Sequence, residues 1–433
     1  MRSKKEVENL FIKGKHFCVL PWIHLHVTGY GYISPCCQQR EGPNSKGYGS
    51  LNENSLPELW QGEAIRNFRL KMLADEWDER CLNCYENESV NQNTVRIFSN
   101  YDFRKYLPWV MDTDDTGYAS QAKPIYWDLR FSNICNLKCR ICNFSSSSSW
   151  HKDAQALGLV DSNTPGAVIH GLKSPAAFLS DLKQYYPEVD YIYFAGGEPL
   201  LFTENLSLLE DLNSLRRHRV KLRYSTNFTQ LNPRVLELWK KFPKIELLIS
   251  LDGSEERGEY QRKGLVWNEI IHNLDYVKKE CPQVEIKIHF TVNAFNILHL
   301  PDFHREMVEK GYIKKVYKMY MNILHNPEYY NVKILPEELK KQATQKLKEH
   351  IAWLTNEKKP LLGAQKYQRL FVSQWYACTD YMNSEDWTHL IPKFIEVTNQ
   401  LDQLRNEKCL EVFPELAPVF KNLLNTKNTK NMK

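Results

Sequence analysis

Three cysteines in the stretch NICNLKCRICNF (residues 133–144) follow the pattern C-x3-C-x2-C: Cys135, Cys139 and Cys142. Two cysteines at C-x2-C spacing would form half of a zinc site, and four would complete a tetrahedron. Three thiolates can instead hold three irons of a [4Fe-4S] cube and leave the fourth iron open. An open iron can chelate a small molecule, so the spacing points to a metal cluster that binds a ligand.

A second group of cysteines lies near the start of the chain. Five of the eleven cysteines fall in the first 84 residues, namely Cys18, Cys36, Cys37, Cys81 and Cys84. The C-x2-C spacing of the last two lets their thiolates converge on one metal. Clustered thiols in a reducing compartment indicate metal rather than disulfides. Taken from the residues alone, four of the five could bind zinc or an iron–sulfur cluster.

The remaining cysteines, Cys281, Cys378 and Cys409, are isolated along the chain. An isolated thiol usually behaves as a small buried hydrophobic side chain. We therefore expect these three to belong to the core.

Other polar residues come directly after apolar runs. They are Gly196, Gly197 and Glu198 in AGGEP, Ser225 and Asn227 in YSTN, Asp252 in ISLDG, and Arg262 in YQRKG. The two glycines lack a Cβ, so a ligand could approach their backbone closely. A carboxylate beside them suits an ammonium group, the Ser, Asn and Asp side chains suit hydroxyls, and the arginine suits a carboxylate. The inferred ligand carries an amine, a carboxylate and a ribose, and it binds iron.

Six apolar runs position these residues: IYWDLRFS, YIYFAGGEP, KLRYSTNF, IELLISLDG, EIKIHFTVN and KKVYKMYMN. Helix-length segments separate them, so strand and helix alternate as in parallel β/α units with right-handed crossovers. Six units are too few for a closed eightfold barrel. We expect an α/β fold with a partial (β/α)6 TIM-like barrel, whose site lies at the carboxyl ends of the strands.

The flanking segments complete the domain prediction. Residues 1–111 form a small cysteine-rich module, 112–124 a polar linker, 125–334 the partial barrel, and 335–433 a mostly helical extension. In the module, HLHVTGYGYIS reads as two strands joined by a turn, and residues 55–73 read as an amphipathic helix capped by Ser55. We expect His24 and His26 to share a half-exposed strand face, and the serines 145–149 to form a flexible polar stretch.

The C-x3-C-x2-C loop followed by GGEP resembles the radical S-adenosylmethionine (radical SAM) superfamily, over residues 124 to about 325. The resemblance implies that Cys135, Cys139 and Cys142 hold a [4Fe-4S] cluster and that the amine and carboxylate of SAM chelate its open iron. It places Glu198 at the SAM amine and Ser225 and Asn227 at the ribose, with Asp252 and Arg262 as further contacts. The family usually has an aromatic residue just before the last cysteine, where this chain has Ile141.

Residues 16–90 resemble the twitch module, a shortened relative of the SPASM domain, which binds an auxiliary [4Fe-4S] cluster. The implied ligands are Cys18, Cys36, Cys81 and Cys84, with Cys37 left over. The module commonly follows the barrel, whereas here it precedes it. Four thiolates would close the cluster and favour electron transfer, whereas three would leave an iron that could anchor substrate.

These resemblances imply a radical SAM enzyme of oxidoreductase type. Reductive cleavage of SAM would give a 5′-deoxyadenosyl radical that abstracts hydrogen from an unknown substrate, and the auxiliary cluster would accept an electron. The alternatives are a maturase that modifies a ribosomal peptide or protein side chain and a dehydrogenase of an aminocyclitol or sugar-like molecule. A zinc-binding interaction or RNA-binding protein is the non-enzyme alternative. No catalytic residue can be named from the sequence.

Composition, charge and hydropathy limit the classes of partner that we expect. The chain has 433 residues, 42% of them hydrophobic, and a net charge of +5 that neither demands nor excludes nucleic acid. The N-terminus MRSKKEVENLF is polar, and no apolar stretch approaches the length of a membrane span. We expect a cytoplasmic protein with an external electron donor of flavodoxin or ferredoxin type, a peptide or small-molecule substrate, and neither a membrane nor a nucleic-acid partner.

Overall fold

The computed structural model describes residues 3–39, 47–89, 94–161, 166–358 and 365–421. It divides the chain into two compact units. Unit 1 comprises Met1–Ile134, Val168–Ser225 and Asn232–Ile245, and unit 2 comprises Cys135–Ala167, Thr226–Leu231 and Glu246–Lys433. Each unit is described by itself.

All six strands expected from the apolar runs are present. They are β4 (Tyr126–Leu129), β6 (Tyr191–Phe194) and β7 (Lys221–Thr226) in unit 1, and β8 (Ile245–Ser250), β10 (Val284–Val292) and β11 (Met319–Ile323) in unit 2. In unit 1, β4 pairs parallel with β6, and β6 with β7. In unit 2 the order is β11-β10-β8, with β10 and β11 parallel. The expected α/β fold with a partial barrel of parallel strands is confirmed.

The N-terminal hairpin is also present and extends the sheet of unit 1. β1 (His24–Val27) and β2 (Tyr32–Ser34) are antiparallel, and β3 (Gly49–Ser50) follows β2. β1 then pairs parallel with β4, so that His26 lies opposite Asp128. The cysteine-rich module therefore shares a sheet with the first barrel strand, which the sequence pattern did not indicate.

The helix expected over residues 55–73 is two helices. α2 (Leu56–Trp60) begins at Ser55, whose capping box with Glu58 is present, and α3 (Glu63–Leu73) follows Gly62. Glycine disfavours a helix interior and is accepted at an N-cap, which accounts for the break. The other helices of unit 1 are α1 (Lys4–Lys13), α4 (Leu82–Ser89), α5 (Val95–Asp102), α6 (Leu107–Met111), α8 (Pro175–Leu182), α9 (Thr203–Ser214) and α10 (Pro233–Trp239).

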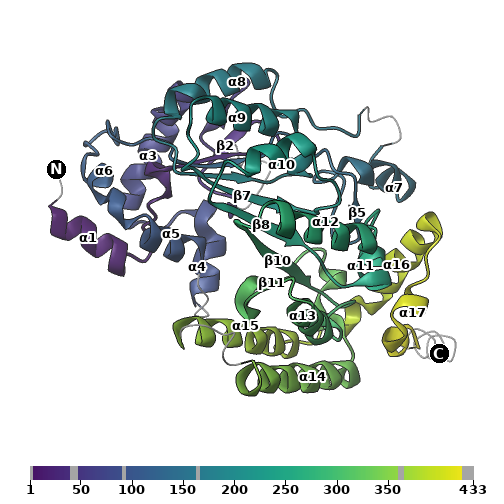
Figure 1. The fold of residues 1–433 in the computed structure, drawn as a ribbon. Coiled ribbons are helices and arrows are strands. Elements are labelled where there is room, and N and C mark those ends of the chain that lie inside the picture. Colours follow the sequence, from purple (N-terminus) through teal and green to yellow (C-terminus); the bar gives the residue numbers. More distant parts are fainter. Residues whose placement is uncertain (1–2, 40–46, 90–93, 162–165, 359–364, 422–433) are drawn as a thin grey trace. The chain divides into compact units, whose positions relative to one another are not determined.

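One face of the unit 1 sheet is apolar and lies under helices. Figure 1 shows α8, α9 and α10 on the same side of the strands, and the three helices pack in sequence. Phe131 contacts Phe178 of α8 with ring centroids 6.1 Å apart, and Tyr224 of β7 contacts Trp239 of α10 at 5.2 Å. Alternation along the strands leaves the polar side chains on the opposite face.

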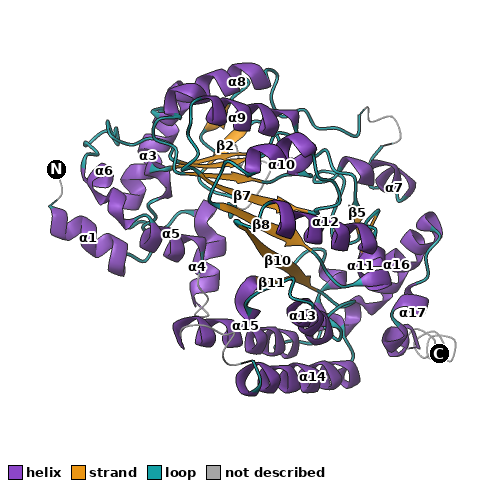
Figure 2. Ribbon diagram, in the orientation of Figure 1, coloured by secondary structure: helices purple, strands orange, loops and turns teal. Residues whose placement is uncertain are grey.

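Unit 2 is rich in helices, as Figure 2 shows for its C-terminal part. The helices are α7 (His151–Ala156), α11 (Glu255–Gln261), α12 (Trp267–Glu280), α13 (Leu300–Glu309), α14 (Glu337–Asn356), α15 (Gln365–Asn383), α16 (Ile391–Arg405) and α17 (Cys409–Val412). α14 packs against α15. Phe295, just after β10, contacts Phe394 of α16 at 5.1 Å and Phe413 at 5.7 Å. The expected helical C-terminal region is confirmed, and its aromatic side chains join the core of unit 2.

Within the described part of the chain, no helix combines the length and apolar character that crossing a bilayer requires. Cys281, Cys378 and Cys409 are all buried, as expected of isolated thiols.

Candidate metal centres and their surroundings

The cysteines of the C-x3-C-x2-C loop converge in unit 2. Cys139 interacts electrostatically with both Cys135 and Cys142, and Cys142 with Cys135. Burial raises the pKa of Cys139 to about 12 and that of Cys142 to about 11. Cys139 is buried and Cys135 and Cys142 are half-buried, so three bare thiolates would repel one another here. Iron–sulfur ligation requires thiolates, and the positive charge of the iron offsets theirs. The donor set therefore fits a [4Fe-4S] cluster.

Arg262 lies directly opposite Cys139. The short strands β5 (Lys138–Cys139) and β9 (Arg262–Lys263) pair antiparallel, with Cys139 facing Arg262. Arg262 Nη1 donates to Cys139 Sγ at 3.7 Å, and Arg262 Nη2 lies 2.8 Å from Asp252 Oδ2. Asp252 Oδ1 also accepts from the backbone N–H of Thr291 at 2.8 Å. In this structure Asp252 thus orients Arg262, instead of presenting a free carboxylate to hydroxyls.

The Nε donor of Arg262 is available to a ligand. Its Nε is buried and has no hydrogen-bond partner among the residues that the structure describes. A buried unpaired guanidinium nitrogen is costly, and an anionic ligand would satisfy it. This arrangement is compatible with the carboxylate contact expected of Arg262.

Asn227 lies beside the first cysteine of the loop. Its Nδ2 is 3.8 Å from Cys135 Sγ and donates to Asn136 Oδ1 at 2.9 Å. Its Oδ1 accepts from the hydroxyl of Thr229 at 2.7 Å, and Thr229 in turn accepts from Asn136 Nδ2 at 2.8 Å. This closed network fixes the Asn227 amide, so that it donates toward the Cys135 sulfur. Hydrogen bonds to ligand sulfurs are one means by which proteins tune such clusters.

The serine run after the loop is not a free polar stretch, so the expectation of flexibility is wrong. Ser149 Oγ donates to the carbonyl oxygen of Cys135 at 2.7 Å, and Ser147 Oγ to that of Leu137 at 2.6 Å. Trp150 Nε1 donates to the carbonyl oxygen of Cys139 at 2.7 Å. These bonds satisfy carbonyl groups of a short loop that a sheet or helix would otherwise satisfy, and they hold the loop's shape.

The C-terminal region contacts the same loop through ion pairs. Arg140, whose side chain is 0% exposed, pairs with Asp402 of α16 and lies 2.7 Å from Glu407 Oε2. Its guanidinium also stacks on Tyr260, 3.7 Å from the ring centroid. In Figure 1, α16 and α17 (yellow) lie near α11, and α17 packs on α11. No sequence pattern indicates this role, because residues 140 and 402 are far apart in the chain.

A second ion-pair set strengthens this attachment. Asp153 of α7 lies 2.8 Å from Lys138 Nζ through Oδ1 and 2.8 Å from Arg405 Nε through Oδ2. The side chain of Arg405 is 0% exposed and also stacks on Trp150 at 4.9 Å. The segment 402–407 therefore holds both edges of the cysteine loop. We call it the C-terminal strap.

The GGEP residues lie in unit 1. Gly196 has φ 93°, and a Cβ on Gly197 would stand 2.1 Å from the carbonyl oxygen of Ile134. The glycines thus let this turn pack against the chain's own backbone at residues 132–134. Glu198 is 1% exposed, its backbone N–H donates to the carbonyl oxygen of Ile134 at 2.7 Å, and its Oε1 accepts from the N–H of Leu200 at 3.1 Å. Ser225 hydrogen-bonds Tyr193.

The N-terminal cysteines converge in unit 1. Cys36 interacts electrostatically with Cys18, Cys81 and Cys84, and Cys18 interacts with Cys81 and Cys84. Burial raises the pKa of all four thiols, that of Cys81 to about 12. The four expected auxiliary ligands are therefore brought together, and their chemistry fits an iron–sulfur cluster as the first set does.

Cys37 has different surroundings. The charged groups that act most strongly on its thiol are Asp128 and Arg130, and Gln38 Nε2 lies 3.8 Å from its Sγ. Burial raises its pKa to about 11. The thiols of Cys18, Cys81 and Cys84 are among the groups that act most strongly on Cys36 but not among those that act most strongly on Cys37, which favours Cys36 as the auxiliary ligand.

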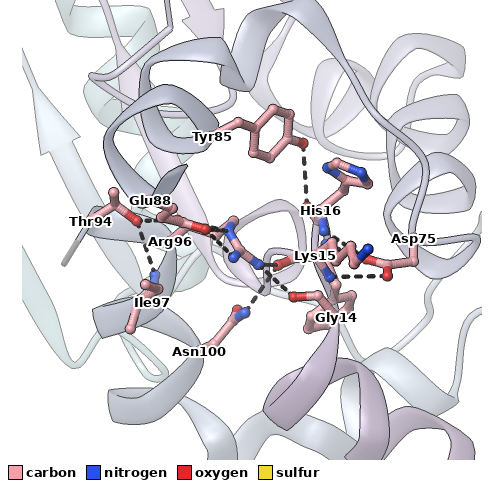
Figure 3. A network of polar contacts seen from close by, with 11 residues as sticks. Gly14, Lys15, His16, Asp75, Tyr85, Glu88, Thr94, Arg96, Ile97 and Asn100 are labelled. Carbon is pink, nitrogen blue, oxygen red and sulfur yellow. Dashed lines mark hydrogen bonds and ion pairs between the residues drawn. The ribbon is translucent and has the colours of Figure 1, made fainter. Parts of the chain in front are cut away.

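The backbone just before Cys18 is held from two sides, and Figure 3 shows these contacts at Gly14, Lys15 and His16. The carboxylate of Asp75 accepts from the backbone N–H groups of Lys15, His16 and Phe17 at 3.0, 2.7 and 2.9 Å. From the other side, Arg96 Nη1 donates to the carbonyl oxygens of Gly14 and Phe17 at 3.0 and 2.9 Å.

Asp75 and Arg96 together form what we call the clamp on the Cys18 loop. Further contacts support Arg96 and the backbone around Cys18. Glu88 of α4 pairs with the guanidinium of Arg96 and accepts from the hydroxyl of Thr94. Asn100 of α5 donates to the carbonyl oxygen of Phe17 at 3.0 Å and accepts from the N–H of Val19 at 2.9 Å. Cys18 therefore lies in a backbone segment whose polar groups are paired on both sides.

Across the residues that the structure describes, no three His, Cys, Asp or Glu side chains stand at the spacing of one bound metal ion. Zinc draws its ligands to about 2.0–2.3 Å from a single centre. A four-iron cube is larger, and its cysteine ligands stand farther apart.

The family models match both cysteine regions. The model of the radical SAM superfamily matches residues 129–310. The chain contains a radical SAM domain. The SPASM model, described as an iron–sulfur cluster-binding domain, matches residues 18–85. The radical SAM domain uses SAM and a [4Fe-4S] cluster, and the SPASM domain adds an auxiliary iron–sulfur cluster. These matches favour iron–sulfur over the zinc alternative, and they confirm the family expected from the motifs.

Solved structures show partial similarity. A structure of anSMEcpe with bound AdoMet and the Cp18Cys peptide is 22% identical, with 52% of this chain and 58% of that chain covered and a TM-score of 0.38. Streptococcus suis SuiB bound to S-adenosylmethionine is 15% identical, with 67% and 63% covered and a TM-score of 0.36. The matched region spans less than two thirds of either protein. A search of curated proteins found no match.

Proposed function

We propose that this radical SAM protein oxidises a substrate, using SAM bound at a [4Fe-4S] cluster on Cys135, Cys139 and Cys142. The auxiliary cluster would be held by Cys18, Cys36, Cys81 and Cys84 and would accept an electron from the substrate. The convergence of the buried Cys139 and the half-buried Cys135 and Cys142 beside Arg262 is the observation that carries this proposal. A [4Fe-4S] cluster held by these three cysteines would supply the one-electron reductive cleavage of SAM to methionine and a 5′-deoxyadenosyl radical, the species that would take hydrogen from the substrate.

The chain's own residues position the reactants and tune their charge. Arg262 places a cation beside Cys139 and keeps one donor for the SAM carboxylate. Asn227 donates toward Cys135 from a fixed amide. Glu198, beside Gly196 and Gly197, is the proposed partner of the SAM amine, and Ser225 the partner of a ribose hydroxyl. The C-terminal strap and the serine run hold the cysteine loop in one shape, which pre-organises the site.

Besides the substrate, the proposed electron transfer involves the auxiliary cluster and an external electron donor. Four protein thiolates would close the auxiliary cluster, which suits electron transfer rather than substrate chelation. An external donor of flavodoxin or ferredoxin type would reduce the SAM cluster. The buried Arg96, whose charge acts on both Cys18 and Cys84, would offset the negative charge of the auxiliary thiolates.

The test is formation of 5′-deoxyadenosine by anaerobically purified protein with SAM and dithionite. The wild type should form it, and Cys139→Ala should fall to the level of a protein-free control. Cys281→Ala, which removes an isolated buried thiol, should retain the activity. Equal rates in Cys139→Ala and the wild type would overturn the proposal. Deuterium transfer from candidate peptides or small molecules into 5′-deoxyadenosine would then distinguish a maturase from a small-molecule dehydrogenase.

A further inference from the structure

The unit 1 sheet buries side chains on both of its faces. His24 and His26 of β1 are only 2% and 4% exposed, so the expectation of a half-exposed histidine face is wrong. β1 pairs with β4 instead of forming a sheet edge. The opposite face lies under α9 and α10 (Figure 1), and the packing there leaves a cavity of about 40 Å³ beside Tyr224 of β7.

The cavity has mainly apolar walls and two buried polar groups. Leu209 of α9 and Val235 of α10 are among its apolar side chains, whereas Asn205 of α9 and Tyr224 are polar. Asn205 is 3% exposed and Tyr224 is 1% exposed. Asn205 Oδ1 has no hydrogen-bond partner among the residues that the structure describes, and the Tyr224 hydroxyl has no acceptor among them. The indole N–H of Trp239, which acts on that hydroxyl, can only donate.

These two groups are complementary to one water molecule. Asn205 Nδ2 donates to the carbonyl oxygen of Pro199 at 2.8 Å, which fixes the amide and leaves Oδ1 as the acceptor at the cavity. The Tyr224 hydroxyl has a proton to donate. A water can accept from the hydroxyl and donate to Oδ1 at the same time. The cavity also exceeds the roughly 10–15 Å³ that a buried water occupies.

The cavity lies between the two segments of unit 1 that carry proposed SAM contacts. Pro199 directly follows Glu198, and Tyr224 directly precedes Ser225. Tyr224 lies opposite Phe194, the last residue of β6, so the strand ladder ends before Glu198. A bridge from Asn205 to Tyr224 would therefore tie the GGEP turn to the end of β7, beyond the point where the ladder holds them together.

We propose that a water molecule in this cavity bridges Asn205 and Tyr224, and that both side chains are positioning residues that hold Glu198 and Ser225 at a fixed separation for SAM. This inference rests on the proposed function, because it requires that Glu198 and Ser225 contact SAM. It adds two residues that do not touch SAM themselves. Their effect reaches SAM through the backbone at Pro199 and at the end of β7.

Three variants test the bridge in the anaerobic holoenzyme with oxidised clusters, with SAM affinity measured by calorimetry. Tyr224→Phe removes only the hydroxyl, and SAM should then bind roughly fivefold more weakly, as expected when one hydrogen bond is lost. Asn205→Leu removes the acceptor and the bond to Pro199, so it should weaken SAM binding further. In the double variant, Tyr224→Phe should have no additional effect, because Asn205→Leu has already broken the bridge.

Tyr186→Phe is the matched control. Tyr186 is a buried tyrosine of unit 1, 1% exposed, and its hydroxyl donates to Asp211 Oδ2 at 3.1 Å, outside the cavity. This variant should unfold at a lower temperature than the wild type and bind SAM with wild-type affinity. Thermal unfolding and iron content show whether each variant is folded and holds its clusters.

A high-resolution crystal structure of the wild type tests the water itself. It should show a water within hydrogen-bond distance of both Asn205 Oδ1 and the Tyr224 hydroxyl. This measurement does not depend on whether any variant folds. A cavity without water in the wild type would overturn the inference.

Three affinity results would also overturn it. Tyr224→Phe could bind SAM as tightly as the wild type, it could have the same effect with and without Asn205→Leu, or Tyr186→Phe could weaken SAM binding as much. Formation of 5′-deoxyadenosine by the wild type separates these failures from that of the proposed function. A wild type that cleaves SAM while any of these results holds refutes only the bridge. A wild type that neither binds nor cleaves SAM refutes the proposed function and this inference with it.

Discussion

Cys139 and Arg262 face each other across the ladder of β5 and β9, with Arg262 Nη1 3.7 Å from Cys139 Sγ. This contact places a positive charge, itself oriented by Asp252, next to a proposed cluster ligand. The reduction potential of a cluster depends on hydrogen bonds to its sulfurs and on nearby charge.

Arg262→Gln should therefore lower the reduction potential of the SAM cluster, because an added electron loses a nearby cation. The effect should be on the order of 1 kcal/mol, or roughly 40 mV for a one-electron couple. Redox titration followed by electron paramagnetic resonance measures it. Arg234→Gln, at an exposed arginine paired with Glu210, is the control. An unchanged or raised potential in Arg262→Gln would show that its charge does not act on the cluster.

The C-terminal strap should be needed for a stable cysteine loop. Asp402→Asn combined with Glu407→Gln leaves the buried Arg140 without its two carboxylates. Removing the partners of a buried charge typically costs about 3–5 kcal/mol. The double variant should unfold at lower temperature and hold less iron after reconstitution. Glu411→Gln, in an exposed pair with Lys408, should match the wild type in both measurements, and a double variant that did so too would refute this role.

The clamp on the Cys18 loop should act on the auxiliary cluster alone. Asp75→Ala removes the acceptor of three backbone N–H groups, and hydrogen bonds to a charged group contribute about 1.5–3 kcal/mol each. We expect loss of the auxiliary-cluster signal while the SAM cluster stays reducible, and partial recovery in Asp75→Asn, which keeps one oxygen. Iron content and electron paramagnetic resonance report both clusters. Equal loss of the two signals would instead indicate general unfolding.

A buried histidine pair makes unit 2 sensitive to acid. His304 Nδ1 lies 2.8 Å from His350 Nε2, and His304 Nε2 lies 2.8 Å from the carbonyl oxygen of Val316. Burial lowers the pKa of His304 from 6.5 to about 4 and that of His350 to about 2, the latter with the charges of His304 and Arg305 adding to the shift. Protons then bind the unfolded chain first, so this contribution to stability is full above pH 6.5 and declines as the pH falls toward 4.

The corresponding measurement is denaturant unfolding at several pH values between 5 and 7. The free energy of unfolding of the wild type should decrease toward pH 5, and the double variant His304→Gln with His350→Gln should show a flatter dependence. The same slope in both proteins would mean that other groups cause the acid sensitivity.

Local patterns predicted much of the fold. Alternating apolar residues located all six barrel strands, and the turn residues around Gly31 located the β1–β2 hairpin. The cysteine spacing and GGEP predicted the family. These features are determined by residues close together in the sequence, so the periodicity of apolar residues and the types of turn residue reveal them.

Features that depend on distant residues were missed. The two-residue strands β5 and β9 are too short to leave a pattern, yet they bring Arg262 to Cys139. The pairing of Arg140 with Asp402 joins residues that are far apart in the chain. The parallel register of β1 with β4, which sets His26 opposite Asp128, likewise could not be read from either strand alone.

In the proposed SAM cluster, three thiolates leave one iron free for SAM. Pulsed electron paramagnetic resonance of the reduced protein, with SAM labelled at the methionine nitrogen, measures whether SAM binds that iron. We expect a hyperfine coupling between that nitrogen and the cluster in the wild type, and its loss in Cys139→Ala. A reduced cluster in the wild type that shows no coupling to the labelled nitrogen would contradict this proposal.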